Sequence, residues 1–151
     1  MQVEPALSTD WEAIKALLNA ARLPLAGLDD QFPDAYVVIR DGPRLAGVAG
    51  LQRHGQFGLL RSVAVAEVSR GLGLGRALVT ERLAAGRNVG LQGAYLLTTD
   101  AAEWFLRLGF ERAARTTVPA ELLASPEFID ACPASAACLR VRWERSNISS
   151  V

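Results

Sequence analysis

The residues with the clearest chemical potential form a glycine-rich turn near the middle of the chain. Gly71, Gly73 and Gly75 alternate directly after an apolar segment, and an apolar helix is predicted to begin at once after them. Glycine lets a backbone approach a ligand closely, and the first turn of a helix presents N–H groups that have no partner within the helix. Arg70 and Arg76 flank the turn and add positive charge. The pattern therefore predicts a site for a phosphate or pyrophosphate group.

Two common phosphate motifs do not fit this turn. A P-loop requires a lysine and then Ser or Thr after its last glycine, whereas Arg76 follows Gly75. The dinucleotide fingerprint requires a glycine at its sixth position, but that residue is Arg76 counted from Gly71 and Leu78 counted from Gly73. A turn with a purely structural role is a further alternative.

The pattern Arg70-x-x-Gly73-x-Gly75 resembles the pyrophosphate turn of the Gcn5-related N-acetyltransferases (GNAT), which use acetyl coenzyme A (acetyl-CoA). Residues 63–65 (Val-Ala-Val) are similar to the strand end that precedes this turn in the family, and residues 103–110 are similar to a later helix that ends in a Gly-Phe pair. The resemblance implies a GNAT domain over residues 1–143, a polar tail over residues 144–151, and acetyl-CoA as the cofactor.

The resemblance also implies which residues hold the cofactor. In this family a bulge in the strand before the turn frees amide groups that bond the acetyl carbonyl and the pantetheine arm, and here that strand is predicted over residues 57–65. Polarising a carbonyl requires N–H donors rather than a particular side chain. The implied cofactor-binding residues are Val63, Ala64, Val65, Arg70, Gly71, Leu72, Gly73, Leu74, Gly75, Arg76 and Phe105.

Short segments place the chain near two groups within the family. Residues 60–65, 95–99, 104–105 and 132–138 resemble the arsenic-resistance-associated N-acetyltransferases and, next, the acetyltransferase domain of bacterial N-acetylglutamate synthase. The resemblance implies a small-molecule amine as acceptor, either glutamate-like or an amino-acid analogue that contains arsenic or phosphorus. Relatives are often dimers, so a homodimer is one expected state.

The predicted catalytic positions depart from the usual family pattern. Many relatives have a tyrosine that protonates the leaving thiolate where this chain has Phe105, and many have an asparagine where it has Thr98. Phe105 cannot donate a proton, although a thiol of pKa about 8.5 leaves tolerably without help. The hydroxyl of Thr98 is predicted either to form a hydrogen bond to the cofactor or the backbone, or to have a structural role at the end of its strand. Ser62 is predicted to relay a proton through water, whereas Glu67 and Glu103 are expected to be surface carboxylates.

The predicted acceptor-binding residues are Arg61 and His54. Strict alternation along residues 57–65 predicts that Arg61 shares a face with Val63 and Val65. A charged side chain in so apolar a strand needs a partner, because burying a lone charge is costly. A substrate carboxylate would suit the guanidinium, and an internal ion pair is the equal alternative. His54, the only histidine, is expected in a loop, either near the substrate with a pKa suited to proton transfer or simply exposed.

Composition narrows the classes of partner. With 151 residues, half of them hydrophobic, the chain is expected to form one domain with a real core. The 16 basic and 16 acidic residues balance, which argues against nucleic acid as the main partner. No apolar run approaches the ~18 residues of a membrane span and the start lacks a signal-peptide pattern, so a cytoplasmic location without a membrane partner is expected. Cys132 and Cys138 are expected to be buried thiols rather than a disulfide or a metal site.

The elements that must position these residues are strands and helices in alternation. Strands are predicted over residues 1–5, 35–40, 44–52, 57–65, 94–99, 110–117 and 136–143. Helices are predicted over residues 11–22, 73–87 and 101–108, with shorter pieces at 28–32, 119–124 and 126–131. This order predicts a single-domain α/β fold with a mixed sheet. The resemblance implies its GNAT form, a mostly antiparallel sheet of six or seven strands flanked by helices.

These inferences give one leading hypothesis and two alternatives. The leading hypothesis is an acetyl-CoA-dependent N-acetyltransferase that acts on the amine of a small, carboxylate-bearing, amino-acid-like substrate. The second is a protein N-acetyltransferase that modifies α-amino termini or lysines. The third is a non-catalytic acyl-CoA-binding module, which the phenylalanine at position 105 favours.

Overall fold

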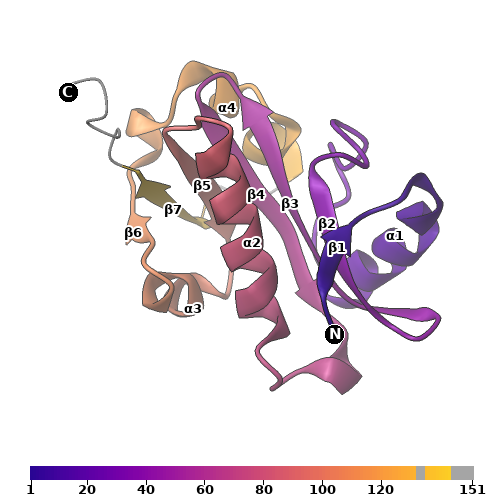
Figure 1. The fold of residues 1–151 in the computed structure, drawn as a ribbon. Coiled ribbons are helices and arrows are strands. Elements are labelled where there is room, and N and C mark those ends of the chain that lie inside the picture. Colours follow the sequence, from indigo (N-terminus) through magenta and orange to yellow (C-terminus); the bar gives the residue numbers. More distant parts are fainter. Residues whose placement is uncertain (132–134, 144–151) are drawn as a thin grey trace, which may run out of the picture.

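The computed structural model describes residues 1–131 and 135–143 and contains one seven-stranded sheet flanked by helices. The strands lie in the order β1-β2-β3-β4-β5-β7-β6 (Figure 1). Neighbouring strands are antiparallel except β4 and β5, which are parallel. This confirms the predicted α/β fold with a mixed, mostly antiparallel sheet. The strands are β1 (Val3–Pro5), β2 (Tyr36–Asp41), β3 (Arg44–His54), β4 (Phe57–Val65), β5 (Gly93–Thr98), β6 (Glu111–Arg112) and β7 (Ala137–Arg142).

Along the chain, helical segments connect most of the consecutive strands. The α-helices are α1 (Trp11–Ala20), α2 (Leu74–Asn88), α3 (Ala102–Arg107) and α4 (Ala120–Leu123). Short 3₁₀ turns form η1 (Ser8–Asp10), η2 (Glu67–Ser69) and η3 (Arg115–Thr117), and a π-helical turn forms η4 (Glu127–Ala131). None of the helices within residues 1–131 and 135–143 combines the length and apolar character that a membrane span requires.

The two longest helices cover opposite faces of the sheet. Successive residues of a strand point to opposite faces, and β2 shows this directly. Val38 packs with Leu18 of α1, whereas Val37 packs with Leu78 of α2. In Figure 1, α2 lies in front of the strands. The end of β4 lies between these two layers, since Ala64 packs on the α1 side and Val63 and Val65 pack on the α2 side.

The sheet opens between β4 and β5. Their pairing consists of Phe57 with Gly93, Gly58 with Ala94, and Leu59 with Tyr95, and it ends there. The last six residues of β4 therefore run on without β5 beside them. This fork leaves space between the two strands for a ligand.

A β-bulge changes the direction of side chains in β4. Ala64 pairs with Val48, but Arg61 pairs with Gly50, so β4 has one residue more than β3 over this stretch. Ser62 takes up the extra residue with a φ of 59°. Val63 and Val65 therefore pack with Leu78 on the α2 face, whereas Arg61 bonds to the 24–26 loop on the other face. The prediction that Arg61 shares a face with these valines is wrong, because a bulge shifts the alternation by one residue.

Two predicted elements also differ from the structure. Residues 28–32 form turns rather than a helix, because Gln31 within this stretch adopts a positive φ angle of 62° that a right-handed helix excludes. The strand predicted over residues 110–117 is limited to β6, since the chain turns into η3 at Arg115. The predicted tail over residues 144–151 and Cys132 lie outside the described residues, whereas Cys138 is a buried thiol, as predicted.

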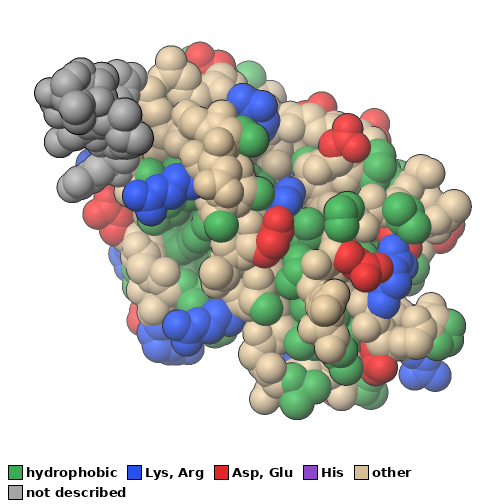
Figure 2. Space-filling model, in the orientation of Figure 1, with side chains coloured by type: hydrophobic (Ala, Val, Ile, Leu, Met, Phe, Trp, Pro, Cys, Tyr) green, Lys and Arg blue, Asp and Glu red, His purple; other side chains and the backbone are tan. Residues whose placement is uncertain are grey.

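Charge is distributed evenly over the face of the molecule seen in Figure 2. Basic and acidic side chains alternate there, and no continuous basic stripe runs across that face. The distribution agrees with the balanced composition of 16 basic and 16 acidic residues.

Candidate functional site

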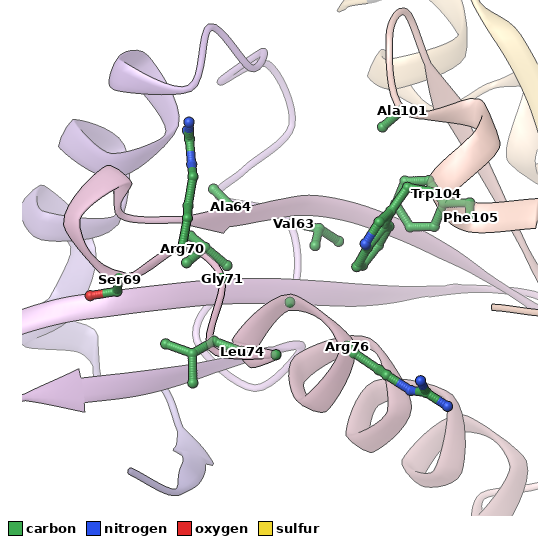
Figure 3. Close-up of a pocket in the computed structure, with 13 residues that line it drawn as sticks. Val63, Ala64, Ser69, Arg70, Gly71, Leu74, Arg76, Ala101, Trp104 and Phe105 are labelled. Carbon is green, nitrogen blue, oxygen red and sulfur yellow. The ribbon is translucent and has the colours of Figure 1, made fainter. Parts of the chain in front are cut away.

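A cavity of about 430 Å³ lies where the end of β4, the glycine-rich turn and α3 meet. Figure 3 shows that its walls come from segments close together in the sequence, before and after the turn, with α3 opposite. All the predicted cofactor-binding residues line this cavity except Leu72, whose side chain is exposed. We call it the donor cavity, and its lining is Val63, Ala64, Val65, Ser69, Arg70, Gly71, Gly73, Leu74, Gly75, Arg76, Ala101, Trp104 and Phe105.

The glycines of the turn are required for two different reasons. Gly71 and Gly73 have φ angles of 83° and 77°, the left-handed region, while a Cβ at either position would meet no atom within 4 Å. Backbone conformation, not space, therefore selects glycine at these two positions. A Cβ on Gly75 would lie 3.2 Å from Cζ2 of Trp104, so close packing against α3 selects glycine there.

The start of α2 is suited to an anion. Ala77 is the first residue whose N–H bonds to a carbonyl of this helix, that of Gly73, at 3.1 Å. The preceding N–H groups of the first turn have no partner within the helix, and the helix dipole adds positive potential. Arg70 and Arg76 extend from the turn in different directions (Figure 3). A pyrophosphate fits this combination of N–H groups and two cationic side chains.

A second cavity of about 380 Å³ lies on the other side of the fork, and we call it the acceptor cavity. It shares Val63, Ala64, Val65, Arg70, Ala101 and Phe105 with the donor cavity. Arg61, Ser62 and Thr98, which were predicted on the substrate or catalytic side, line this second cavity. The two cavities thus meet at the bulge of β4, where Ser62 and Val63 have no paired residue in either neighbouring strand.

Arg61 is buried and fully oriented in the wall of the acceptor cavity. Its side chain is 1% exposed and lies 3.6 Å from a carboxylate oxygen of Glu127, measured from Nε. Nη1 donates to the carbonyl of Ala26 at 2.7 Å and Nη2 to that of Pro24 at 3.2 Å. The internal ion pair is therefore present, and the same guanidinium still lines the cavity.

The other predicted acceptor and catalytic residues lie in different environments. Ser62 is buried, and its Oγ accepts a hydrogen bond from Nε of Arg61 at 3.0 Å. Thr98 Oγ1 accepts from the N–H of Ala101 at 3.0 Å, at the start of α3. His54 lies at the end of β3 and lines neither of these cavities. Burial lowers the pKa of its imidazole, so the neutral form predominates at pH 7.

Phe105 borders both cavities. It is buried and packs edge-on against Trp104, with ring centroids 4.8 Å apart, and against Phe110 at 5.6 Å. It presents an apolar ring without a hydroxyl to the point where the cavities meet.

Sequence reasoning assigned no role to several residues of the two cavities. Trp104 borders the donor cavity, but the sequence indicated it only as part of a segment that resembles the family. Glu127 and Arg22 line the acceptor cavity, and no local motif marked either one. Both approach the fork only through the tertiary fold. Within residues 1–131 and 135–143, no group of three or more His, Cys, Asp or Glu side chains is placed to hold a metal ion.

A model of the acetyltransferase (GNAT) domain matches residues 33–112, more than half of the chain. The chain belongs to the GNAT acetyltransferase family. The family is one of N-acetyltransferases that take the acetyl group from acetyl-CoA, and the donor cavity carries two arginines beside the start of α2, where the charge suits a pyrophosphate.

Solved structures share the fold. Rv2747 from Mycobacterium tuberculosis, solved with CoA, is 23% identical with a TM-score of 0.80, and the match covers 95% of this chain and all of that one. N-acetylglutamate synthase from Neisseria gonorrhoeae, solved with coenzyme A and N-acetyl-glutamate, is 21% identical with a TM-score of 0.81. That match covers 95% of this chain and 35% of the synthase. The ribosomal-protein-S18-alanine N-acetyltransferase from Escherichia coli is 17% identical with a TM-score of 0.68, covering 96% of this chain and 95% of that one.

Proposed function

We propose that this GNAT protein transfers the acetyl group of acetyl-CoA to the amine of a small, carboxylate-bearing, amino-acid-like acceptor. One observation carries the proposal: two cavities meet at the bulge of β4, one ending at the cationic start of α2 and the other containing the buried Arg61. A glutamate-like amino acid and an arsenic- or phosphorus-containing analogue both have the carboxylate that Arg61 would bind.

Each part of the donor cavity has a proposed role in binding acetyl-CoA. The N–H groups at the start of α2, with Arg70 and Arg76, would bind the pyrophosphate. Trp104 and Phe105 would pack along the pantetheine arm, because both rings line the cavity between the turn and the fork. Backbone N–H groups released from the ladder at the bulge would bond the acetyl carbonyl.

The proposed reaction forms an N–C bond and breaks a C–S bond at the fork between β4 and β5. The neutral acceptor nitrogen attacks the thioester carbon, the N–C bond forms, and the C–S bond breaks as the thiolate leaves. An acceptor that binds as an ammonium loses one proton before the attack and a second as the amide forms. Both protons pass to water, and Ser62 is the proposed relay since it lines the acceptor cavity. Phe105 cannot protonate the thiolate, so solvent does so, which a thiol pKa of about 8.5 allows. Holding both reactants at one point supplies much of the rate enhancement.

The acceptor cavity favours a small molecule over a protein amine. A peptide acceptor needs a groove for several residues, whereas this cavity measures about 380 Å³ and is lined by the buried charged side chains of Arg61 and Glu127. The absence of a hydroxyl at Phe105 favours one alternative, an acyl-CoA-binding module without catalysis.

The test is thiol release from acetyl-CoA across a panel of amines. The panel contains the common amino acids, amino-acid analogues with arsenic or phosphorus in the side chain, simple amines and a short peptide. Turnover limited to carboxylate-bearing small amines supports the proposal, and turnover of the peptide alone supports a protein acetyltransferase. Tight binding of coenzyme A with no product from any amine would leave the binding module as the function.

A further inference from the structure

Among the residues that the structure describes, the acceptor cavity contains one buried acid. Five charged residues of this described lining face it, and the two acids among them differ in burial: Asp100 is exposed, whereas Glu127 is 5% exposed. We infer that Glu127 binds the ammonium group of the acceptor while Arg61 binds its carboxylate, so that the acceptor is recognised as an α-amino acid zwitterion. This inference rests on the proposed function and specifies its substrate class.

Glu127 is not what orients Arg61. The guanidinium donates to Ser62 Oγ at 3.0 Å and to the backbone carbonyls of Ala26 and Pro24 at 2.7 and 3.2 Å. Its distance of 3.6 Å from the Glu127 carboxylate is longer than a hydrogen bond. Two carbonyls and a hydroxyl therefore hold the cation in place, and Glu127 balances its charge without setting its orientation.

Two opposite charges side by side in a cavity wall match a zwitterion. An α-amino acid carries its ammonium and its carboxylate on one carbon, so both groups reach adjacent partners at the same time. A hydrogen bond between ionised groups is stronger than one between neutral groups, and burial strengthens it further. A simple amine has no carboxylate to bind Arg61. A hydroxy acid has no ammonium group to bind Glu127.

The position of Glu127 brings a bound amine to the reacting point. Glu127 lies beside Arg61, and Arg61 bonds to Ser62 at the bulge where the two cavities meet. Glu127 also begins η4, a π-helical turn, and such turns are frequent at functional sites. The N–H groups of Phe128 and Ile129 bond to the carbonyl of Ser125 at 3.1 and 3.0 Å, and the Phe128 ring is buried in the core. The carboxylate is thus attached to a fixed segment.

The test compares two ligands that differ only at the amine. L-glutamate and L-2-hydroxyglutarate have the same carboxylates, but only glutamate has an ammonium group. Their binding is measured by calorimetry on the enzyme saturated with coenzyme A. We expect the wild type to bind glutamate at least about tenfold more tightly than the hydroxy acid, as the loss of one charged hydrogen-bond partner predicts.

The variant Glu127→Gln should remove this preference. Its affinity for glutamate should fall about 10- to 100-fold, its affinity for hydroxyglutarate should change little, and its affinity for coenzyme A should stay the same. Glu121→Gln is the matched control, because Glu121 is an exposed acid on α4 that does not line the cavity. If Glu127→Gln reduces the folded fraction, Glu127→Asp keeps the charge one methylene further back and should show an intermediate preference.

Several results would overturn the inference. They are a wild type that binds both ligands equally or binds neither, and a Glu127→Gln variant that keeps the preference for glutamate. The proposed function fails on a different measurement, the lack of thiol release by the wild type with every amine of the panel. The two failures are therefore distinguishable.

Discussion

The donor cavity and the acceptor cavity are neighbours, yet they are built in different ways. The donor cavity consists largely of backbone and of residues within two short segments, 63–76 and 101–105. The acceptor cavity collects side chains from residues 21–24, 60–65 and 96–101 and from Arg70, Phe105 and Glu127. A pyrophosphate is bound mainly by N–H groups at a helix start, which a local motif can encode. An acceptor is bound by side chains, and these come from wherever the fold brings them together.

The largest expected effect tests the backbone character of the donor cavity. Gly73→Val places a β-branched residue in the left-handed region and displaces the first N–H groups of α2. We expect the dissociation constant of coenzyme A, measured by calorimetry, to rise by about 50-fold or more. Gly42→Val is the matched control, because Gly42 also has a positive φ of 62° and open space but lies in the β2–β3 hairpin.

Both glycine variants should lose about 1–2 kcal/mol of unfolding free energy from the same backbone strain. Only Gly73→Val should also lose coenzyme A. An equal loss of affinity in both variants would mean that general destabilisation, and not the turn, controls binding of the donor.

The next prediction tests whether the acceptor and the donor bind independently of each other. Arg61→Gln removes the buried cation, so KM for a carboxylate-bearing acceptor should rise about 10- to 100-fold while the affinity for coenzyme A is unchanged. Arg44→Gln, at an exposed position at the start of β3, should change neither value. A parallel loss of coenzyme A affinity in Arg61→Gln would show that the two cavities are not independent.

A smaller effect concerns the two arginines at the turn. Arg70→Ala and Arg76→Ala should each weaken coenzyme A binding about three- to tenfold, and the loss should shrink at high salt because both side chains are exposed. Arg87→Ala is the control, since Arg87 is exposed on the same helix but at its other end. Loss of affinity that does not depend on salt would contradict an electrostatic contribution.

The smallest effect is expected at the border of the cavities. Phe105→Tyr adds the hydroxyl that many relatives use, but in the proposed mechanism the thiolate leaves without an acid. We therefore expect kcat to rise no more than about threefold, measured between pH 6 and pH 9. A much larger gain would mean that protonation of the thiolate limits the wild-type reaction.

The local parts of the fold and site were predictable from the sequence. Alternating and helical periodicities gave the main strands and helices, and the turn with its three glycines led to the donor cavity. The family resemblance implied a bulge in this strand, but the strict alternation applied to residues 57–65 left it out and failed at Ser62, because no residue type there fixes the position of a bulge. The helix expected at residues 28–32 failed for a related reason, since a positive φ at Gln31 is supported by its side-chain bonds to the backbone of Arg53.

The sequence by itself determined the family of chemistry. A glycine turn between an apolar strand and a helix makes an anion site from neighbouring residues, and the backbone supplies its donors without help from distant segments. Only the tertiary structure decided the acceptor side. The bulge turned Arg61 away from the valines of its own strand, and the packing of η4 brought Glu127 within 3.6 Å of it from a distant part of the chain. Side-chain charges recognise a substrate only after the fold has placed them together, and no local pattern records that placement.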